Sequence, residues 1–376
     1  MYVGWDVDFS LELFGFTKRN NTNMKIGFYS PYFDSLGGGE RYVFTLAGHW
    51  SKHHDVSIFC NDLGIVEKAQ DRFHLDLSRV KTVSNFFSDA SRLSKIFLSS
   101  QYDCIFFLSD GSVPSSWATH NILHFQVPFP RISFPFWKRI KTDAIICNSM
   151  FTKNTIDPSI GKLADVIYPP VDIHQFQKGK KEKVILSVGR FSSHFQAKKQ
   201  EILINMFTRG VKNGLLRGWK LILAGGLLSS DDKYFKSITS KTNGLPIQCI
   251  ANISFTHLQE LYANSSIYWH AAGYGETNPQ YMEHFGMTTV EAMAAECIPI
   301  VYNAGGQPEI IEHEKSGYIW NTQDECLLYT QKVIHSEKMR EDMQAQAKQR
   351  AELFSIELFY RRFDALLFAF EKKNNV

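Results

Sequence analysis

The chain has 376 residues, of which 44% are hydrophobic and 21% charged, and its formal net charge at pH 7 is only +3. This composition is typical of a globular protein with room for two domains, and the small net charge gives no support for nucleic-acid binding. No apolar run approaches the roughly 20 residues that a membrane-spanning helix needs.

Residues 1–23 are interpreted as an extension before the first domain. They carry Asp6, Asp8 and Glu12 where a secretory signal would have a basic region, so we do not expect a signal peptide. Met24, directly before the run KIGFYS, is a natural domain start. The six cysteines form no CxxC unit and lie in or beside apolar runs, which favours reduced core thiols in a cytoplasmic protein.

The first half of the chain alternates short apolar runs with polar or amphipathic stretches. Lys25–Ser30 predicts a strand, a glycine-rich turn follows, and Tyr42–Trp50 predicts a helix. This alternation indicates a Rossmann-like parallel sheet with helices on both faces. Further strands are expected at Val56–Cys60, Cys104–Leu108, Ile122–Gln126, Ala144–Cys147 and Val166–Tyr168.

The glycine-rich turn is the first candidate site. Gly37, Gly38 and Gly39 precede Glu40 and Arg41, and the pattern is neither a dinucleotide fingerprint nor a Walker loop. Gly38 and Gly39 could let the backbone approach a ligand, and the helix start could then meet an anion. A simple tight turn is an equal alternative.

Two further features of this half carry open alternatives. His124 ends an apolar strand, where open α/β sheets bind ligands, although a lone histidine is more often structural. Arg131–Lys141 interleaves basic and aromatic residues, which is compatible with contact to an anionic membrane surface. The alternative for that stretch is a helix with one buried aromatic face.

The pattern breaks at Pro169-Pro170 and then begins again, so we interpret 24–168 and 169–355 as two Rossmann-like domains facing each other across a cleft. The amphipathic segment Leu358–Lys372, within a helix over about 356–376, is expected to pack back on the domains. The second series of strands is expected at Val184–Val188, Lys220–Ala224, Pro246–Ile250, Ile267–His270 and Ile298–Tyr302, with helices at Gln200–Asn213 and Asp324–Ile334.

Candidate ligand groups follow several of these strands. Arg190 and Lys198 are two cations that suit a diphosphate, which arginine can hold with two parallel hydrogen bonds. The turns Gly225-Gly226 and Ala304–Glu309 recur at strand ends, where glycine permits close approach.

Glu283 and Glu291 lie eight positions apart, with Gly286 between them. We expect Glu283 on a loop and Glu291 in the first turn of a helix that Thr288 or Thr289 would cap. Carboxylates hold sugar hydroxyls and helix N-termini hold phosphates, so this arrangement suits a nucleotide-activated sugar.

Taken in order, these features resemble the retaining family-four glycosyltransferases, which have the GT-B fold, over nearly everything after Met24. The GGGER and EHFG forms are similar to mannosyltransferases that extend lipid-linked oligosaccharides and to bacterial polysaccharide enzymes. The loop between Arg190 and Lys198 is longer than in the usual family pattern. The matching segments are GGGER (37–41), CNSMFTKN (147–154), YPPVD (168–172), SVGRF (187–191) with Lys198, EHFGMTTVE (283–291) and AGGQPEII (304–311).

The resemblance implies a role for each candidate residue. Glu283 contacts the donor sugar, Glu291 holds the ribose hydroxyls, and His124 faces the donor sugar and the acceptor. Arg190 and Lys198 neutralise the diphosphate leaving group. The remaining binding positions are Gly38 and Gly39, which close on the phosphates, and the backbone of Phe285, Gly286, Met287 and Thr288, which meets sugar and phosphate.

The function expected from this resemblance is transfer of mannose or another hexose, with retention, from a nucleoside-diphosphate sugar to a saccharide or lipid-linked acceptor in polysaccharide or glycoconjugate synthesis. No cofactor is expected, and metal independence is predicted because no DxD-type acidic motif lies in a plausible loop. The alternatives are another GT-B sugar-nucleotide enzyme, such as an epimerase or phosphorylase, and a non-catalytic sugar-nucleotide-binding scaffold. The expected location is cytoplasmic, with peripheral membrane contact through Arg131–Lys141 as an addition.

Overall fold

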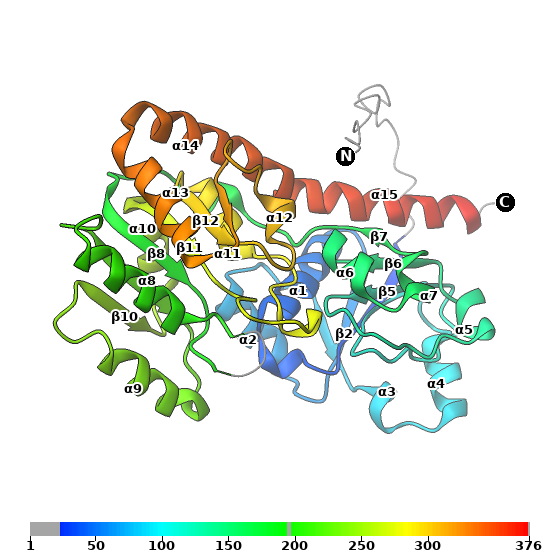
Figure 1. Ribbon diagram of the computed structural model, residues 1–376. Helices are drawn as coiled ribbons and strands as arrows, with labels where there is room; N and C mark the ends of the chain where they lie inside the picture. The colour runs from blue at the N-terminus through cyan, green and yellow to red at the C-terminus, as the bar shows by residue number, and fades with distance from the viewer. Residues whose placement is uncertain (1–22, 194–196, 375–376) are drawn as a thin grey trace.

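The computed structural model describes residues 23–193 and 197–374, and it contains two separate parallel sheets flanked by helices (Figure 1). The expected fold class is therefore confirmed. The proposed extension, residues 1–23, lies outside the described residues apart from Asn23. No described helix has the length and apolar character that crossing a bilayer requires, and all six cysteines are free thiols.

The first sheet has seven strands in the order β3-β2-β1-β4-β5-β6-β7. Alternate residues of its central strands enter two hydrophobic clusters on opposite faces, as Phe106 and Phe107 of β4 show. Its strands are β1 (Lys25–Tyr29), β2 (Asp55–Phe59), β3 (Lys81–Val83), β4 (Cys104–Leu108), β5 (His120–Phe125), β6 (Ala144–Cys147) and β7 (Asp165–Val166). Its helices are α1 (Gly38–Trp50), α2 (Ile65–Phe73), α3 (Phe86–Asp89), α4 (Arg92–Ser99), α5 (Phe136–Ile140), α6 (Met150–Thr155) and α7 (Pro158–Gly161).

The second sheet has six strands in the order β10-β9-β8-β11-β12-β13, and it too divides its side chains between two clusters. Its strands are β8 (Glu182–Val188), β9 (Lys220–Gly225), β10 (Ile247–Ala251), β11 (Ser265–His270), β12 (Ile298–Tyr302) and β13 (Tyr318–Trp320). Its helices are α8 (Gln200–Lys212), α9 (Asp232–Ser240), α10 (Phe255–Asn264), α11 (Met287–Ala294), α12 (Gln307–Ile310), α13 (Gln323–His335) and α14 (Glu337–Ala351).

The last helix, α15 (Ile356–Asn374), runs back along the first half (Figure 1). Its residues Phe359, Phe363, Leu367 and Phe370 lie in the same hydrophobic cluster as the α1 side chains. The chain crosses between the sheets in the connection from β7 to β8, which contains the expected boundary at 168/169. That boundary stays a prediction.

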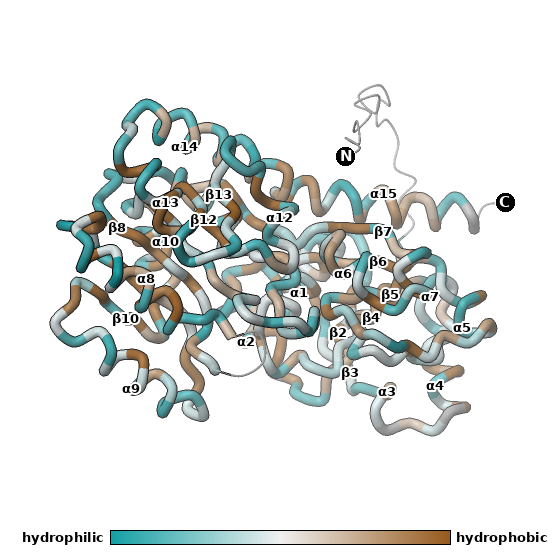
Figure 2. The backbone as a smooth tube through the Cα atoms, viewed as in Figure 1, coloured by the Kyte–Doolittle hydropathy of each residue, from teal (hydrophilic) through white to brown (hydrophobic). Residues whose placement is uncertain are grey.

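Two strands and one long helix are among the elements that have no counterpart in the expected pattern. β3 and β13 have only three residues each, too few to show a periodicity. Helix α14 is missed because its sequence EKMREDMQAQAKQRA is polar on nearly every side, and Figure 2 shows it mostly in the hydrophilic colour. Its few small apolar residues, such as Ala347 and Ala351, are buried by contacts that only the tertiary structure provides.

Candidate active site

Each sheet reverses its strand order at one point, beside β1 in the first sheet and beside β8 in the second. In the first sheet the chain steps from β1 to β4, and in the second it steps from β8 to β11. Crevices at the carboxyl ends of such strands are where open α/β sheets bind ligands. The predicted residues Arg190 and Lys198 follow β8, and Glu283 lies in the connection that follows β11.

The centre of the candidate site is the carboxylate of Glu283. Its Oε2 accepts hydrogen bonds from Lys198 Nζ at 2.5 Å and from His270 Nε2 at 3.1 Å. Its Oε1 has no hydrogen-bond partner among the described residues, and 14% of the side chain is exposed. One carboxylate oxygen is thus fixed by the protein, and the other is available to a ligand.

Electrostatics keep this carboxylate ionised. Burial alone would raise the pKa of Glu283, but Lys198 and His270 outweigh it and hold that pKa well below its usual range. Burial lowers the pKa of His270, so the ring is neutral at pH 7 and its Nε2–H donates to Glu283. Its Nδ1 is then an acceptor, and this buried atom has no partner among the described residues.

The approach of Lys198 depends on Gly189 at the end of β8. A Cβ at Gly189 would lie 2.6 Å from Lys198 Cγ, so only glycine leaves room for the lysine stem. The neighbouring Lys199 pairs with Glu276 at 2.5 Å instead. The two adjacent lysines therefore have different carboxylate partners. From the sequence, they could be distinguished only by aligning them with the family pattern.

Arg190 is exposed, and its guanidinium has no ion-pair or hydrogen-bond partner among the described residues. Only its carbonyl is engaged, by Gln200 Nε2 at 3.1 Å. Gln200 is buried and also accepts a hydrogen bond from Tyr234. The backbone at Arg190 is therefore held in place, while its side chain is free to meet an anion.

The loop that carries Glu283 is supported from behind by the turn Ala304–Glu309. The Gly306 N–H donates to the Glu283 carbonyl at 2.8 Å. A Cβ at Gly305 would lie 1.9 Å from that carbonyl oxygen, and one at Gly306 would lie 2.5 Å from the His284 carbonyl oxygen. The close approach that these glycines permit is to the protein's own backbone.

Gly286 gives the same loop its sharp turn into α11. Its φ is +119°, which a residue with a side chain rarely adopts, and a Cβ there would collide with Gln307. Gln307 also holds the loop, because it accepts from Thr289 Oγ1 at 3.0 Å and donates to the Phe285 carbonyl.

The expected start of this helix was wrong. The residue that caps α11 is Gly286, not Thr288 or Thr289, and Glu291 is its fifth residue and lies beyond the first turn. The reason is tertiary: Thr288 Oγ1 accepts from Tyr268 and Thr289 donates to Gln307, so neither side chain is available to cap the helix.

Glu291 joins the two halves of the molecule. It is buried, it pairs with Arg41 Nη1 at 3.1 Å, and it accepts a hydrogen bond from Tyr262 at 3.0 Å. Burial raises the pKa of Glu291, although Arg41 and Tyr262 oppose the shift. Arg41 belongs to the GGGER stretch of the first half, so two motifs that lie far apart in the sequence meet at this carboxylate.

Among the other GGGER residues, Glu40 fixes the start of α1, while Gly38 and Gly39 lie close to residues of other segments. The Glu40 carboxylate accepts from the Gly37 N–H and from Ser35 Oγ, each at 2.8 Å, and so fixes the start of α1. Gly38 lies beside Met287, since a Cβ there would be 3.9 Å from its sulfur. Gly39 lies against Gln126, which a Cβ would approach to 2.5 Å. Gly38 and Met287, both predicted binding positions, are thus neighbours across the interface.

His124 is fully buried at the end of β5. Its ring stacks on Tyr42 with centroids 4.1 Å apart, and its Nε2 lies 3.0 Å from Gln126 Nε2. Burial lowers the pKa of His124 to about 3, so the ring is neutral. All these partners belong to the first half, and no contact joins the described ring to the Glu283 group. Its role toward sugar and acceptor stays a prediction.

The segments Cys147–Asn154 and Ala304–Glu309 meet each other. Glu309 accepts hydrogen bonds from the N–H groups of Met150 at 2.8 Å and Phe151 at 2.5 Å. Ser149 accepts from the Thr152 N–H. Together these side chains satisfy the first three N–H donors of α6, so the two segments form a further contact between the halves.

Four residues of this arrangement were missed by the sequence reasoning. A histidine or tyrosine at a strand or helix end gives no signal by itself, and Arg41 was read only as part of a glycine loop. The signal for His270 was its place at the end of β11, next to the Glu283 loop. The missed residues are Arg41, Tyr262, His270 and Gln307.

Two parallel α/β sheets, with candidate residues at the carboxyl ends of both and contacts that join them, define the GT-B class of protein. The chain belongs to the glycosyl transferases group 1: that family matches residues 170–350, and the family described as Glycosyltransferase Family 4 matches residues 36–175. The family resemblance drawn from the sequence motifs is therefore confirmed.

Among curated proteins, the chain is similar to enzymes named GDP-Man:Man(3)GlcNAc(2)-PP-Dol alpha-1,2-mannosyltransferase. The identity to the Dictyostelium discoideum protein is 26% over 215 residues, which is 53% of this chain and 41% of that protein. The identity to the Xenopus laevis protein is 26% over 238 residues, which is 58% of this chain and 46% of that protein. The chain thus matches somewhat less than half the length of these relatives.

Among solved structures, Anabaena HepE in complex with UDP and glucose has a TM-score of 0.70 at 18% identity, covering 92% of this chain and 100% of its own. A glycosyltransferase from Rickettsia africae has a TM-score of 0.72 at 16% identity, covering 93% of this chain and 99% of its own. At these identities the similarity is one of fold.

Proposed function

We propose that the chain is a retaining glycosyltransferase that moves a hexose from a nucleoside-diphosphate sugar to a saccharide or lipid-linked saccharide. The observation that carries the proposal is the ionised Glu283 carboxylate, which has one oxygen fixed by Lys198 and His270 and one oxygen without a partner among the described residues. A buried, oriented carboxylate of this kind can hold sugar hydroxyls and favour positive charge that develops on the sugar ring.

The leaving group would be a nucleoside diphosphate, on which negative charge grows as the sugar departs. Arg190 is the proposed first partner, because its guanidinium is exposed and has no ion-pair partner among the described residues. Lys198 can share its charge between Glu283 and a phosphate, and the N-terminus of α11 adds N–H donors beside Gly286. With these donors the proposed reaction needs no metal, which transfer measured in excess EDTA would check.

Glu291 is the proposed anchor of the ribose. In the structure Arg41 bonds to Oε1 and Tyr262 bonds to Oε2. A carboxylate oxygen can accept a second hydrogen bond, so a ribose hydroxyl could bind beside Arg41, whose side chain remains 21% exposed. Gly38 and Gly39 lie at the start of α1, the helix that also carries Arg41, and this position fits their proposed approach to the phosphates.

GDP-mannose is the first donor to test, because the curated relatives are named for GDP-Man as donor. Their names also give a glycan linked to dolichyl diphosphate, which supports a lipid-linked acceptor as the first choice. The solved Anabaena relative binds UDP and glucose, so UDP-glucose is the second donor to include.

The deciding experiment is a thermal-shift screen of GDP-, UDP- and ADP-sugars, followed by a transfer assay with the donor that binds. A ligand that binds only the folded state raises the melting temperature, by an amount that grows with its concentration relative to Kd. We expect one donor class to raise it and an acceptor to be glycosylated with the anomeric configuration retained. Binding without transfer to any acceptor would favour the scaffold, and release of an epimer or sugar phosphate would favour another sugar-nucleotide enzyme.

A further inference from the structure

Two short helices of the first half present large apolar side chains outward. In α4, Leu93 and Phe97 are 79% and 67% exposed, and in α5, Phe136 and Ile140 are 76% and 65% exposed. Each pair has i,i+4 spacing and so lies on one side of its helix. Helix α5 has no buried residue, which rules out the alternative of a helix with one buried aromatic face.

The segment Val113–Ala118 connects these helices into one surface, which we call the α4–α5 surface. The Trp117 N–H donates to Ser99 Oγ at the end of α4, and Lys141 lies over the Trp117 ring at 5.7 Å. Lys138 of α5 donates to the Val113 carbonyl. Figure 1 places both helices at the end of the molecule that is far from the second sheet.

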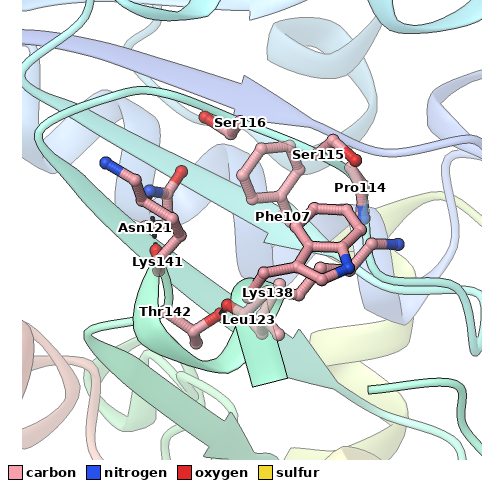
Figure 3. A pocket seen from close by; sticks show the side chains of 10 residues that line it. Phe107, Pro114, Ser115, Ser116, Asn121, Leu123, Lys138, Lys141 and Thr142 are labelled. Carbon is pink, nitrogen blue, oxygen red and sulfur yellow. Dashed lines mark hydrogen bonds between the residues drawn. The ribbon is translucent and has the colours of Figure 1, made fainter. Parts of the chain in front are cut away.

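The hollow within this surface is too small to be a ligand pocket. Figure 3 shows it lined by Pro114, Ser116, Lys138 and Lys141, among others, and its volume is about 10 Å³, the room of one water molecule. The surface therefore offers exposed rings and cations, and not a cavity, to whatever it binds.

Basic residues outnumber acidic ones in the chain segments that form this surface. The stretches 91–100, 112–119 and 131–141 contain six lysines and arginines and no aspartate or glutamate, whereas the whole chain has 41 basic and 38 acidic residues. Arg131, Arg139 and Lys141 are exposed around the apolar side chains. Protein interfaces exclude charge from their cores and are depleted of lysine, whereas aromatic and aliphatic side chains among lysines and arginines suit the interface of an anionic bilayer.

We infer that the α4–α5 surface docks on a membrane that contains anionic lipids, with Phe97, Phe136 and Ile140 entering the headgroup region and the surrounding cations contacting lipid phosphates. The inference goes beyond the proposed function and does not need the donor site. It would bring the first half of the molecule to the place where a lipid-linked acceptor resides.

The test is co-sedimentation of the full chain with two kinds of vesicle. One contains phosphatidylcholine alone, and the other also contains phosphatidylglycerol at roughly one anionic lipid in three. We expect binding to the anionic vesicles that weakens as salt rises, because exposed cations are screened. The variant Phe136→Ser/Ile140→Ser should lower the partition constant about tenfold, since two apolar side chains leave the interface. Arg139→Gln/Lys141→Gln should lower it for anionic vesicles and reduce the salt dependence.

The matched controls lie elsewhere on the surface. Leu63→Ser/Leu228→Ser removes two other exposed leucines, and Lys212→Gln/Arg217→Gln removes two other exposed cations. Both controls should bind vesicles as the parent does. The donor-induced thermal shift, measured on every variant, reports folding and the donor site separately from docking.

Three results would overturn the inference: no binding of the parent chain to anionic vesicles, equal losses in the control variants, or vesicle binding unchanged by the α5 substitutions. The chain could instead fail to bind vesicles and dimerise in a concentration-dependent way. If Phe136→Ser/Ile140→Ser abolished that dimerisation, the surface would be the interface with a second copy of the chain. A failed transfer assay would leave the vesicle result unaffected, so the two proposals can fail independently.

Discussion

At the residue scale, the candidate site depends on how one carboxylate is held. Glu283 was prominent in the sequence because of its spacing from Glu291 and the glycine between them. The sequence could not show that Lys198 and His270 both use the same oxygen, Oε2, because the three residues come from different segments. Because both partners bind Oε2, Oε1 remains available, and Glu283 can bind substrate as well as form an ion pair.

Glu283→Gln is expected to reduce transfer by about a hundredfold or more, because the neutral amide no longer stabilises positive charge on the sugar. Arg190→Ala should have a comparable effect, through the leaving group. Arg190 is exposed, so its loss should leave the melting temperature unchanged. Steady-state kinetics on the purified variants, with circular dichroism as the folding control, provide the measurement. Parental turnover in a folded variant would contradict the assignment.

His270 is expected to act as a positioning residue that orients Glu283. His270→Gln keeps a donor near Oε2 and should retain more activity than His270→Ala, in which Glu283 loses one of its two partners. We expect kcat to fall about tenfold or more in the alanine variant with a smaller change in KM, because misorientation affects the transition state more than binding. If both variants change only the melting temperature and leave kcat as it was, the histidine is structural.

At the element scale, the glycine turns at Gly225 and at Gly305-Gly306 pack on other backbone segments of the site. Their recurrence at strand ends was visible in the sequence, but their partners were not. Gly225 packs on the Gly189 carbonyl, and Gly305 and Gly306 pack on the Glu283–Phe285 backbone. Close approach of a ligand and close approach of another backbone segment both require a residue without a side chain. The sequence pattern of the glycine is therefore the same in the two cases.

Gly306→Ala is expected to displace the Glu283 loop and abolish the donor-induced thermal shift, because the new Cβ would lie 2.5 Å from the His284 carbonyl oxygen and 2.7 Å from Phe285 Cα. Gly226→Ala is the matched control, since a Cβ there meets nothing within 4 Å. It should behave as the parent in stability and donor binding. The same response from both variants would refute a special role for the Ala304–Glu309 turn.

Glu309→Ala is expected to destabilise the protein by about 1–2 kcal/mol, the usual cost of losing a helix cap, because the first two N–H donors of α6 lose their acceptor. Glu312→Ala, on an exposed neighbour that forms an ion pair with Lys315, is the control. Chemical denaturation of both variants measures the difference. Equal stabilities would mean that the contact between α12 and α6 contributes nothing to the fold.

At the scale of the whole molecule, buried histidines make stability depend on pH. Burial lowers the pKa of His124 to about 3 and that of His284 to about 4, whereas an unfolded histidine titrates near pH 6.5. Between these values the unfolded chain binds the protons and the folded chain does not. Stability from these groups is therefore complete above about pH 6.5 and is lost as the pH falls toward 4.

We expect the free energy of unfolding to fall by about 2 kcal/mol per buried histidine between pH 7 and pH 5, as proton linkage requires. Denaturant titrations over this range would measure it. His124→Phe, which keeps a ring against Tyr42, should reduce the slope. A slope of opposite sign, with stability rising as the pH falls, would show that these rings are protonated in the folded protein.

The sequence by itself determined the fold class, the positions of the main strands along the chain and the identity of Glu283, Glu291, Arg190 and Lys198 as candidates. It could do so because strand periodicity, glycine turns and charged residues at strand ends are local features. The tertiary structure alone decided the partners: His270 and Lys198 on one oxygen of Glu283, Arg41 on Glu291, and Glu309 on α6. It also decided that the α5 aromatic side chains point outward. These outcomes depend on which distant segments are neighbours, and chain order does not contain that information.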